Sequence, residues 1–239
     1  MLKTSFFSII ARVFSNKPKS EMKPSKIIVG LGNPGAKYRG TRHNIGYAVL
    51  EELTKRYATS KARSQFHADA WDAQIGTENV LLLCPTTFMN LSGTSVSEAL
   101  RFYKLNPKTD LLIVCDDLDL PVAKLRIRES AGTGGQKGLK DVVAKIGSQD
   151  FARIRVGIGR PASTDQVVDF VLTNFRKDER DEIDVAIQNA ADAARLWAER
   201  GCAEAMNRYN VNEKKSPKKN KNGDSNNGAK DVKATTNDN

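Results

Sequence analysis

The sequence predicts one α/β domain of three layers, in which a mixed, mostly parallel sheet is flanked by helices on both faces. Short apolar runs alternate along the chain with stretches in which apolar residues recur at helical spacing. Some runs are apolar throughout, as expected for inner strands that are buried on both sides. Segments rich in glycine and uncharged polar residues follow several runs, where loops leave the strands of such a sheet.

The first half of the domain is expected to contain three strands and one helix. Aliphatic residues predict a strand at 27–31, and apolar residues spaced by three or four positions predict a helix at 45–57. Two strands are expected at 64–75 and 79–84, on either side of the turn at 76–78. The second of them is an apolar run, which is typical of an inner strand.

The same criteria assign the second half of the domain. They predict helices at 92–104, 139–146 and 178–200, and strands at 111–114, 124–128 and 154–158. The strand at 124–128 alternates apolar and basic residues, so one of its faces should be exposed. A glycine-rich loop at 132–138 is expected to lead into the helix that follows it.

The two ends of the chain carry most of its formal net charge of +10. Residues 1–26 contain six Lys or Arg and one acid, and residues 213–239 contain seven Lys and four acids. This distribution has two interpretations. The ends could be solvated tails that add solubility, or they could be basic arms that bind a polyanionic partner.

Residues 1–25 have the composition of an organellar transit segment, because they combine basic, serine and large apolar residues with no acid before Glu21. We expect a mitochondrial location, with a plastid as the alternative and the cytoplasm if the segment is not a transit peptide. A short secretory signal is a further interpretation of its apolar stretch. Residues 213–239 have too few apolar residues to bury and are expected to form a disordered basic tail, which leaves the folded domain at 26–212.

The three cysteines are widely spaced and form no Cys-x-x-Cys motif. This pattern disfavours a disulfide framework and a zinc site, and it favours a reducing compartment. No apolar run approaches the roughly 18 residues that are needed to cross a bilayer. We expect a monomer that works without a metal, a cofactor or a membrane contact.

One segment, Gly30 to Gly35, fits the dinucleotide-binding pattern G-x-G-x-x-G. That pattern requires a helix that begins inside it, so that the helix N-terminus meets the pyrophosphate. Here Pro34 disfavours a helical conformation at Asn33, and helical spacing begins only near Ile45. We therefore expect no NAD(P) site, and the glycines should instead let the backbone wrap closely around a site made of side chains.

A histidine and an aspartate follow two of the expected strands and are candidates for a catalytic pair. His43 closes the turn after the strand at 27–31, and Asp116 follows the strand at 111–114. Because strand carboxyl ends line the ligand crevice of an open α/β sheet, the two side chains should lie close together. A histidine can take a proton from water near neutral pH, and a carboxylate on its other ring nitrogen fixes the tautomer. The second histidine, His67, is expected to be a half-exposed strand residue.

Four polar or glycine-containing motifs occur in one collinear stretch of the chain. They are GLGNPGAKYRGTRHNIG (30–46), PTTFMNLSG (85–93), DDLDLP (116–121) and GTGGQKGLKD (132–141). Together they resemble the bacterial-type peptidyl-tRNA hydrolases, and the resemblance extends from about Lys26 to about Tyr209.

This resemblance implies an enzyme that hydrolyses the ester between tRNA and a peptide or N-blocked amino acid. Such an enzyme regenerates free tRNA from the peptidyl-tRNA that dissociates from stalled ribosomes. His43 is then the general base for water, Asp116 orients it, and Asn33 helps to separate blocked from free aminoacyl ends. The tRNA acceptor end and the peptide are expected to contact Tyr38, Phe88, Met89 and Asn90.

The glycine-rich loop departs from the family pattern. It usually reads GGHNG, whereas this chain has Gly134-Gly135-Gln136-Lys137-Gly138. Lys137 cannot accept a hydrogen bond, but it can reach a phosphate; a solvated loop residue is the alternative. The family carries basic residues for the tRNA phosphate backbone, and that role falls on Arg126, Arg128 and Arg155.

A function of another class is compatible with the same fold. Relatives that lack catalytic activity act as RNA-processing subunits in group II intron splicing, together with a protein partner. The presence of His43, Asp116, Asn33 and Asn90 favours the enzyme. An exposed apolar patch on the outer face of a helix would favour the partner-binding subunit.

Overall fold

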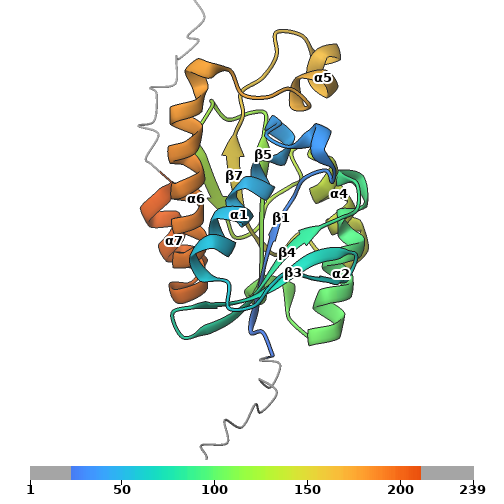
Figure 1. Cartoon of the computed structure of the whole chain (residues 1–239), viewed down its shortest axis with the longest axis vertical. Coiled ribbons are helices and arrows are strands. Elements are labelled where there is room, and N and C mark those ends of the chain that lie inside the picture. Colours follow the sequence, from blue (N-terminus) through green and yellow to red (C-terminus); the bar gives the residue numbers. More distant parts are fainter. Residues whose placement is uncertain (1–22, 211–239) are drawn as a thin grey trace, which may run out of the picture.

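The computed structural model describes residues 23–210 and shows a seven-stranded sheet between two layers of helices (Figure 1). The strands lie in the order β2-β3-β4-β1-β5-β7-β6. They are β1 Lys26–Gly30, β2 Arg63–Gln65, β3 Ala68–Ile75, β4 Glu78–Pro85, β5 Leu111–Asp117, β6 Leu125–Arg128 and β7 Ala152–Gly157. Only the last residues of the expected transit segment are described, and the expected tail at 213–239 lies outside the described residues.

The four central strands are parallel, which confirms the predicted mixed sheet with a parallel centre. β1 pairs in parallel with β4 on one side and β5 on the other, and β5 pairs in parallel with β7. β2, β3 and β6 complete the sheet through antiparallel pairs. The carboxyl ends of the four parallel strands therefore lie at one edge of the sheet, where ligands bind in folds of this class.

Helices cover both faces of this sheet, as the sequence predicts. They are α1 Ile45–Tyr57, α2 Ser92–Tyr103, α3 Pro107–Asp110, α4 Lys137–Ile146, α5 Val167–Val171, α6 Arg180–Arg200 and α7 Cys202–Tyr209. Short 3-10 turns lie at η1 Ala36–Tyr38, η2 Arg42–Asn44, η3 Met89–Leu91, η4 Thr164–Gln166 and η5 Lys177–Glu179. α1, α6 and α7 pack on one face and α2 and α4 on the other (Figure 1). Within residues 23–210, no helix combines the length and the apolar character that a membrane span requires.

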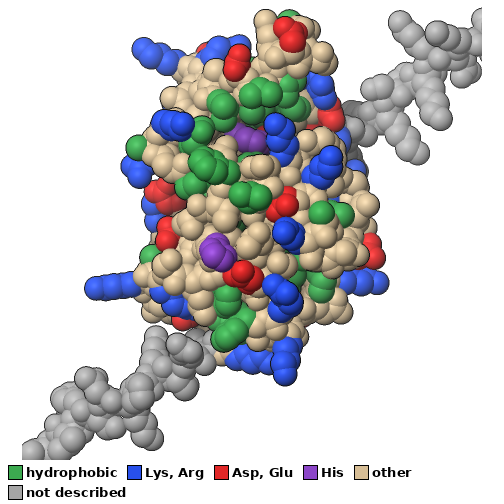
Figure 2. All heavy atoms as spheres, turned by 90° about the vertical axis from the view of Figure 1, so that its right-hand side faces the viewer, with side chains coloured by type: hydrophobic (Ala, Val, Ile, Leu, Met, Phe, Trp, Pro, Cys, Tyr) green, Lys and Arg blue, Asp and Glu red, His purple; other side chains and the backbone are tan. Residues whose placement is uncertain are grey.

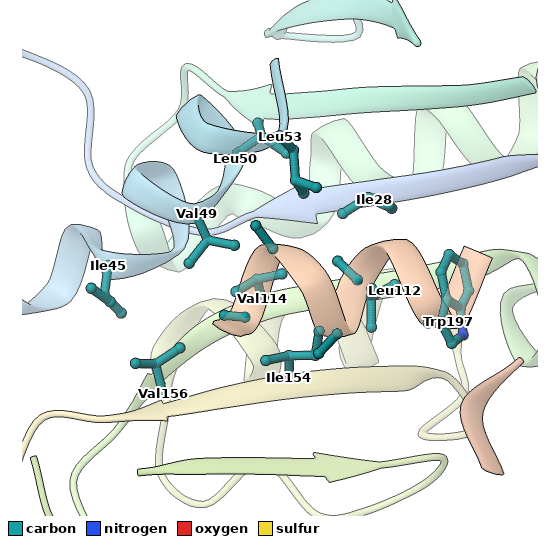
Figure 3. Close-up of a cluster of buried hydrophobic side chains, with 14 of the residues drawn as sticks. Ile28, Ile45, Val49, Leu50, Leu53, Leu112, Val114, Ile154, Val156 and Trp197 are labelled. Carbon is teal, nitrogen blue, oxygen red and sulfur yellow. The ribbon is translucent and has the colours of Figure 1, made fainter. Parts of the chain in front are cut away.

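Alternate residues of the central strands point into two separate hydrophobic clusters. Ile28 of β1 packs with Val49 of α1 and Trp197 of α6 in the first cluster (Figure 3). Its neighbour Ile27 belongs to the second cluster, with Leu139 of α4. Burial of each such side chain contributes roughly 1.5–3 kcal/mol. Because both faces are covered, these strands show continuous apolar runs rather than alternation, and this is the signal that locates them in the sequence.

The strand predicted at 64–75 is instead two strands, β2 and β3, joined by a tight turn at Phe66 and His67. Both turn residues have a positive φ, 57° for Phe66 and 51° for His67. Glycine or asparagine usually takes this conformation, and neither is present to mark the turn in the sequence. His67 therefore lies in a turn rather than in a strand, and its Nε2 is 3.4 Å from Oε1 of Glu98.

Other element boundaries differ from the predicted ones where a strand or a helix includes polar residues. β5 continues past the apolar run to Asp117, so Asp116 lies within a strand rather than in the loop after it. α4 begins at Lys137, before its predicted start, and the Gln136 side chain caps it. The helices α3, α5 and α7 are too short, at four, five and eight residues, for helical spacing to reveal them.

The start of α1 packs against the backbone of the sheet. A Cβ atom added to Gly30 would lie 2.3 Å from the Gly46 carbonyl oxygen, so only glycine fits at this approach. The turn η2, which directly precedes α1, thereby contacts β5 and carries His43 toward Asp116. α1 begins at Ile45 and not inside the glycine pattern at 30–35, as the sequence predicts.

Candidate active site

A pocket of about 350 Å³ lies at the carboxyl edge of the sheet and brings the four sequence motifs together. The motif residues that line it include Asn33, His43, Phe88, Met89, Asn90, Asp116, Gln136 and Lys137. Figure 2 shows hydrophobic side chains gathered around one of the two histidines, with Lys and Arg side chains beside it. The edge of the sheet is the one at which α/β proteins bind ligands.

The predicted pair of His43 and Asp116 is in direct contact. Nδ1 of His43 lies 2.8 Å from Oδ2 of Asp116. A carboxylate only accepts hydrogen bonds, so in a hydrogen bond with it Nδ1 is the donor, and Nε2 is the ring nitrogen left to accept a proton. Among residues 23–210, Nε2 of His43 has no hydrogen-bond partner, and the ring lines the pocket. This is the arrangement that a general base for water requires.

Gln136 is a site residue that the sequence analysis misses. Its Nε2 donates to the second carboxylate oxygen of Asp116, Oδ1, over 3.1 Å, while its Oε1 accepts from the backbone N–H of Leu139 over 2.6 Å. The two oxygens of Asp116 are thus held by separate donors, and the same glutamine caps α4. The signal was present in the loop sequence, where glutamine replaces the family's usual histidine directly before Lys137.

Asn33 joins two of the four motifs through its backbone and side chain. Its Oδ1 accepts from the backbone N–H of Met89 over 2.8 Å, and its own N–H donates to Oδ1 of Asn44 over 2.8 Å. The Asn44 amide returns a hydrogen bond to the Asn33 carbonyl over 2.9 Å. Within the described part of the chain, Nδ2 of Asn33 has no partner, so this donor is available to a ligand in the pocket.

The pocket has an apolar wall that comes partly from an element the sequence does not reveal. Phe88 is 54% exposed at the rim, whereas Met89 is buried and Asn90 is exposed. Further apolar lining comes from α5 and the residue after it, through Val167, Val168, Val171 and Leu172. These aliphatic side chains make this part of the pocket apolar.

Two of the predicted substrate-binding residues differ in their relation to the pocket. Lys137 is exposed at the first position of α4 and lines the pocket, so it faces the place where the expected ligand would lie. Tyr38 does not line it. Tyr38 is half-buried in η1, where the ammonium group of Lys37 lies 4.8 Å from its ring centre.

The three arginines that are expected to contact tRNA phosphates lie in different environments. Arg155 lines the pocket but is buried, with Nη1 3.0 Å from Oδ2 of Asp117 and Nη2 donating to the Gly132 carbonyl. In this position both Nη1 and Nη2 already bond to protein, and Arg155 supports the glycine-rich loop. Arg126 and Arg128 are half-buried on the edge strand β6 and lie outside the pocket.

Arg42, the residue before His43, is an anchor that the sequence analysis does not single out. It is 3% exposed, and its Nη2 lies 2.6 Å from Oε2 of Glu179 at the start of α6. Its guanidinium also packs on the rings of Phe170 and Phe175, 4.5 and 4.8 Å from the ring centres. Burial alone would raise the pKa of Glu179, but hydrogen bonds from Arg42 and the Arg176 backbone, with the Arg42 charge, lower it below its usual value.

The thiol beside Asp116 is not suited to nucleophilic catalysis. Cys115 is buried in β5, and burial, helped by the charge of Asp116, raises the pKa of its thiol to about 12. It therefore packs in the core, as predicted from the sequence. In the described ranges, no group of three or more His, Cys, Asp or Glu side chains is arranged to hold a metal ion.

Comparisons with known proteins agree with the geometry. The family model described as peptidyl-tRNA hydrolase matches residues 27–221. A peptidyl-tRNA hydrolase of Rhodopirellula baltica is 49% identical over 186 residues, which cover 78% of this chain and 97% of that protein. One from Enterococcus faecalis is 46% identical over 187 residues, which cover 77% and 98% of the two proteins.

A solved structure supports the same relationship. The crystal structure of the peptidyl-tRNA hydrolase of Acinetobacter baumannii has 38% sequence identity and a TM-score of 0.74, and the match covers 80% of this chain and 97% of that one. The resemblance carried by the four motifs is therefore confirmed: the chain belongs to the peptidyl-tRNA hydrolase family.

Proposed function

We propose that this protein hydrolyses the ester between tRNA and a peptide or N-blocked amino acid, and so returns tRNA from peptidyl-tRNA to translation. The observation that carries the proposal is the 2.8 Å contact between His43 and Asp116 inside a pocket built from the four family motifs. Its relatives named peptidyl-tRNA hydrolase, at up to 49% identity among those compared, support the same reaction. The alternative of a non-catalytic RNA-processing subunit is not favoured.

In the mechanism we propose, Nε2 of His43 takes a proton from water while the water oxygen attacks the ester carbonyl carbon. Asp116 stabilises the imidazolium that forms at this step. When the tetrahedral intermediate collapses, the carbon–oxygen bond to the ribose breaks, and His43 returns the proton to the ribose oxygen. Water is thus divided between the acyl group, which gains OH, and the tRNA, which gains H.

The remaining residues are proposed to bind and orient the substrate. Nδ2 of Asn33 is free to donate a hydrogen bond to the ester or to the peptide backbone, which suits selection of blocked over free aminoacyl ends. Phe88, Met89 and Asn90 form the adjacent wall. Lys137 offers a charge to a phosphate at the tRNA end.

Three basic or aromatic residues outside the pocket retain proposed roles in tRNA binding. Arg126 and Arg128 on β6 are proposed to contact backbone phosphates, which position a nucleic acid without reading its sequence. Tyr38, which lies in the loop after β1, is proposed to contact the acceptor end of the tRNA. Arg155 is proposed to act indirectly, by holding the glycine-rich loop through Asp117 and Gly132.

The test is hydrolysis of N-acetyl-aminoacyl-tRNA and of unblocked aminoacyl-tRNA by the full chain, each with and without a chelator. We expect cleavage of the blocked ester only, unaffected by the chelator. Equal cleavage of both esters would contradict the proposed selectivity, and loss of activity in the chelator would contradict a metal-free mechanism. A folded protein that binds tRNA but cleaves neither ester would overturn the proposed function.

Further proposals concern the whole chain. We propose that the folded domain spans 26–212, that residues 1–25 direct the protein to the mitochondrion and that residues 213–239 form a basic tail. Fusion of residues 1–25 to a fluorescent protein should give mitochondrial fluorescence, whereas a diffuse cytosolic signal would contradict the targeting proposal. Sedimentation equilibrium should give the mass of a monomer, and the mass of a dimer would contradict that expectation.

A further inference from the structure

A second pocket, of about 560 Å³, lies between α2, α3 and α4, on the face of the sheet that carries α4. Its apolar floor is formed by Leu100, Leu105, Pro107 and Ile146. Three cationic side chains also line it, and they come from the last turn of α2, the residue that ends α2, and the last turn of α4. They are Arg101, Lys104 and Lys145. We call this site the α2–α4 basic pocket.

The cations of the α2–α4 basic pocket are available to a ligand. All three are exposed, and none forms an ion pair with another described residue. Glu98, the one acid in the lining, forms no ion pair with these three cations, and its Oε1 lies 3.4 Å from Nε2 of His67. Cations near helix C-termini are favoured by the helix dipole, but that effect does not require side chains from two helices to line one pocket.

α4 connects this pocket to the active site. Lys137 at its first position lines the active-site pocket, and Lys145 in its last turn lines the basic pocket. Lys145 lies eight positions after Lys137, which at 1.5 Å per residue is about 12 Å along the helix axis. Lys140 is exposed between them. In Figure 2, Lys and Arg side chains follow one another down this face from beside the upper histidine.

We propose that the α2–α4 basic pocket binds backbone phosphates of the same tRNA whose acyl ester lies in the active site. This inference rests on the proposed function and assigns a second contact to that substrate. A distance of about 12 Å corresponds to roughly three or four nucleotides of a stacked strand, at about 3.4 Å each. Phosphate contacts carry no sequence information, which suits an enzyme that must accept every tRNA.

The test compares substrates that do and do not extend to the basic pocket. The long substrate is N-acetyl-aminoacyl-tRNA, and the short one is the same ester on a 3′-terminal dinucleotide. The variant of the full chain carries Arg101→Gln, Lys104→Gln and Lys145→Gln. Its matched control carries Lys177→Gln, Arg200→Gln and Arg208→Gln, three exposed cations in or next to α6 and α7 on the opposite face.

We expect the pocket variant to raise KM for the long substrate about tenfold, with kcat unchanged, and to leave both constants unchanged for the short substrate. The slope of log KM against log salt concentration should fall by roughly 2–3, because about one counterion is released for each lost contact. The control variant should match the wild type on both substrates. Thermal unfolding of both variants confirms that exposed substitutions leave the fold intact.

Two results would overturn the inference. An unchanged KM for the long substrate would show that the three cations interact only with the helix C-termini or with solvent. An equal rise in KM for both substrates would show that they act through the active site. Affinity for uncharged tRNA, measured by fluorescence anisotropy, keeps the inference testable if the wild type cleaves neither ester: a tenfold loss in the pocket variant alone supports it, and equal affinities refute it.

Discussion

At the scale of single residues, the proposed chemistry depends on the contacts of the two carboxylate oxygens of Asp116. Oδ2 meets Nδ1 of His43 at 2.8 Å, and Oδ1 receives Nε2 of Gln136 at 3.1 Å. Because Asp116 lies in β5 opposite Val156 of β7, its backbone is fixed by sheet pairing. The imidazole is therefore held in one tautomer and one orientation by a carboxylate that is itself held from both sides.

Asp116→Asn should lower kcat on N-acetyl-aminoacyl-tRNA by on the order of 10²-fold or more while leaving KM nearly unchanged. The asparagine keeps the shape of the side chain, but it removes the charge that stabilises the imidazolium and no longer fixes the tautomer. The loss should be smaller than that of His43→Ala, since the base remains. Steady-state kinetics of the two variants measure this order, and a reversed order would contradict the assigned roles.

Gln136→Glu should move the acid limb of the kcat/KM profile to higher pH. A glutamate still accepts the hydrogen bond from Leu139 that caps α4, but it places a second carboxylate beside Oδ1 of Asp116. Like charges raise the pKa of the carboxyl pair, and the added negative charge favours protonated His43, which cannot act as a base. Gln136→Met, which removes the donor without adding charge, is the control. An acid limb that is the same in Gln136→Glu and the wild type would rule out this coupling.

At the scale of elements, the active site depends on how the turn η2 is attached to the rest of the fold. Gly30 and Gly46 let the start of α1 approach the sheet, and Arg42 anchors the turn to Glu179 at the start of α6. The same guanidinium packs on Phe170 of α5, the helix that forms the apolar wall of the pocket. The position of His43 is thus coupled to elements that lie far from it in the sequence.

Glu179→Gln should lower the free energy of unfolding by about 3 kcal/mol near neutral pH, because it leaves the buried guanidinium of Arg42 without its counter-charge. The pKa of Glu179 is lowered in the folded protein, so its contribution is present above the unfolded value near 4.5 and is lost as the pH falls through the folded value. Urea unfolding of both proteins should give a difference that narrows below about pH 4.5. A difference that stays constant down to acid pH would contradict the ion pair as its source.

The elements also show which parts of the fold are encoded locally. The helix predicted at 45–57 coincides with α1, because its apolar spacing matches one buried face. The division of 64–75 into β2 and β3 is not visible, because Phe66 and His67 adopt a conformation that their residue types do not favour. α5 is only five residues long, so no periodic pattern marks it, although its apolar side chains line the pocket and pack against the core.

At the scale of the whole molecule, the sequence predicts the layers and the contact between His43 and Asp116, but not the residues that support this pair. The layers follow from continuous apolar runs, and the pair follows from the rule that strand carboxyl ends line the ligand site. Gln136, Arg42 and the buried ion pair of Arg155 with Asp117 depend on contacts between distant segments, which spacing along one chain does not encode. The positive charge of the α2–α4 basic pocket likewise cannot be read from the sequence, because it arises only where α2 and α4 lie side by side.

The most direct test of the central claim is the single-turnover rate of N-acetyl-aminoacyl-tRNA hydrolysis by His43→Ala, with His67→Ala as the matched control. His67 is exposed in a turn and does not line the active-site pocket, so its loss should leave the rate unchanged. The account predicts that His43→Ala folds and binds tRNA as the wild type does, yet loses nearly all hydrolysis, by on the order of 10³-fold. A rate in His43→Ala within a few-fold of the control would contradict the assignment of His43 as the general base.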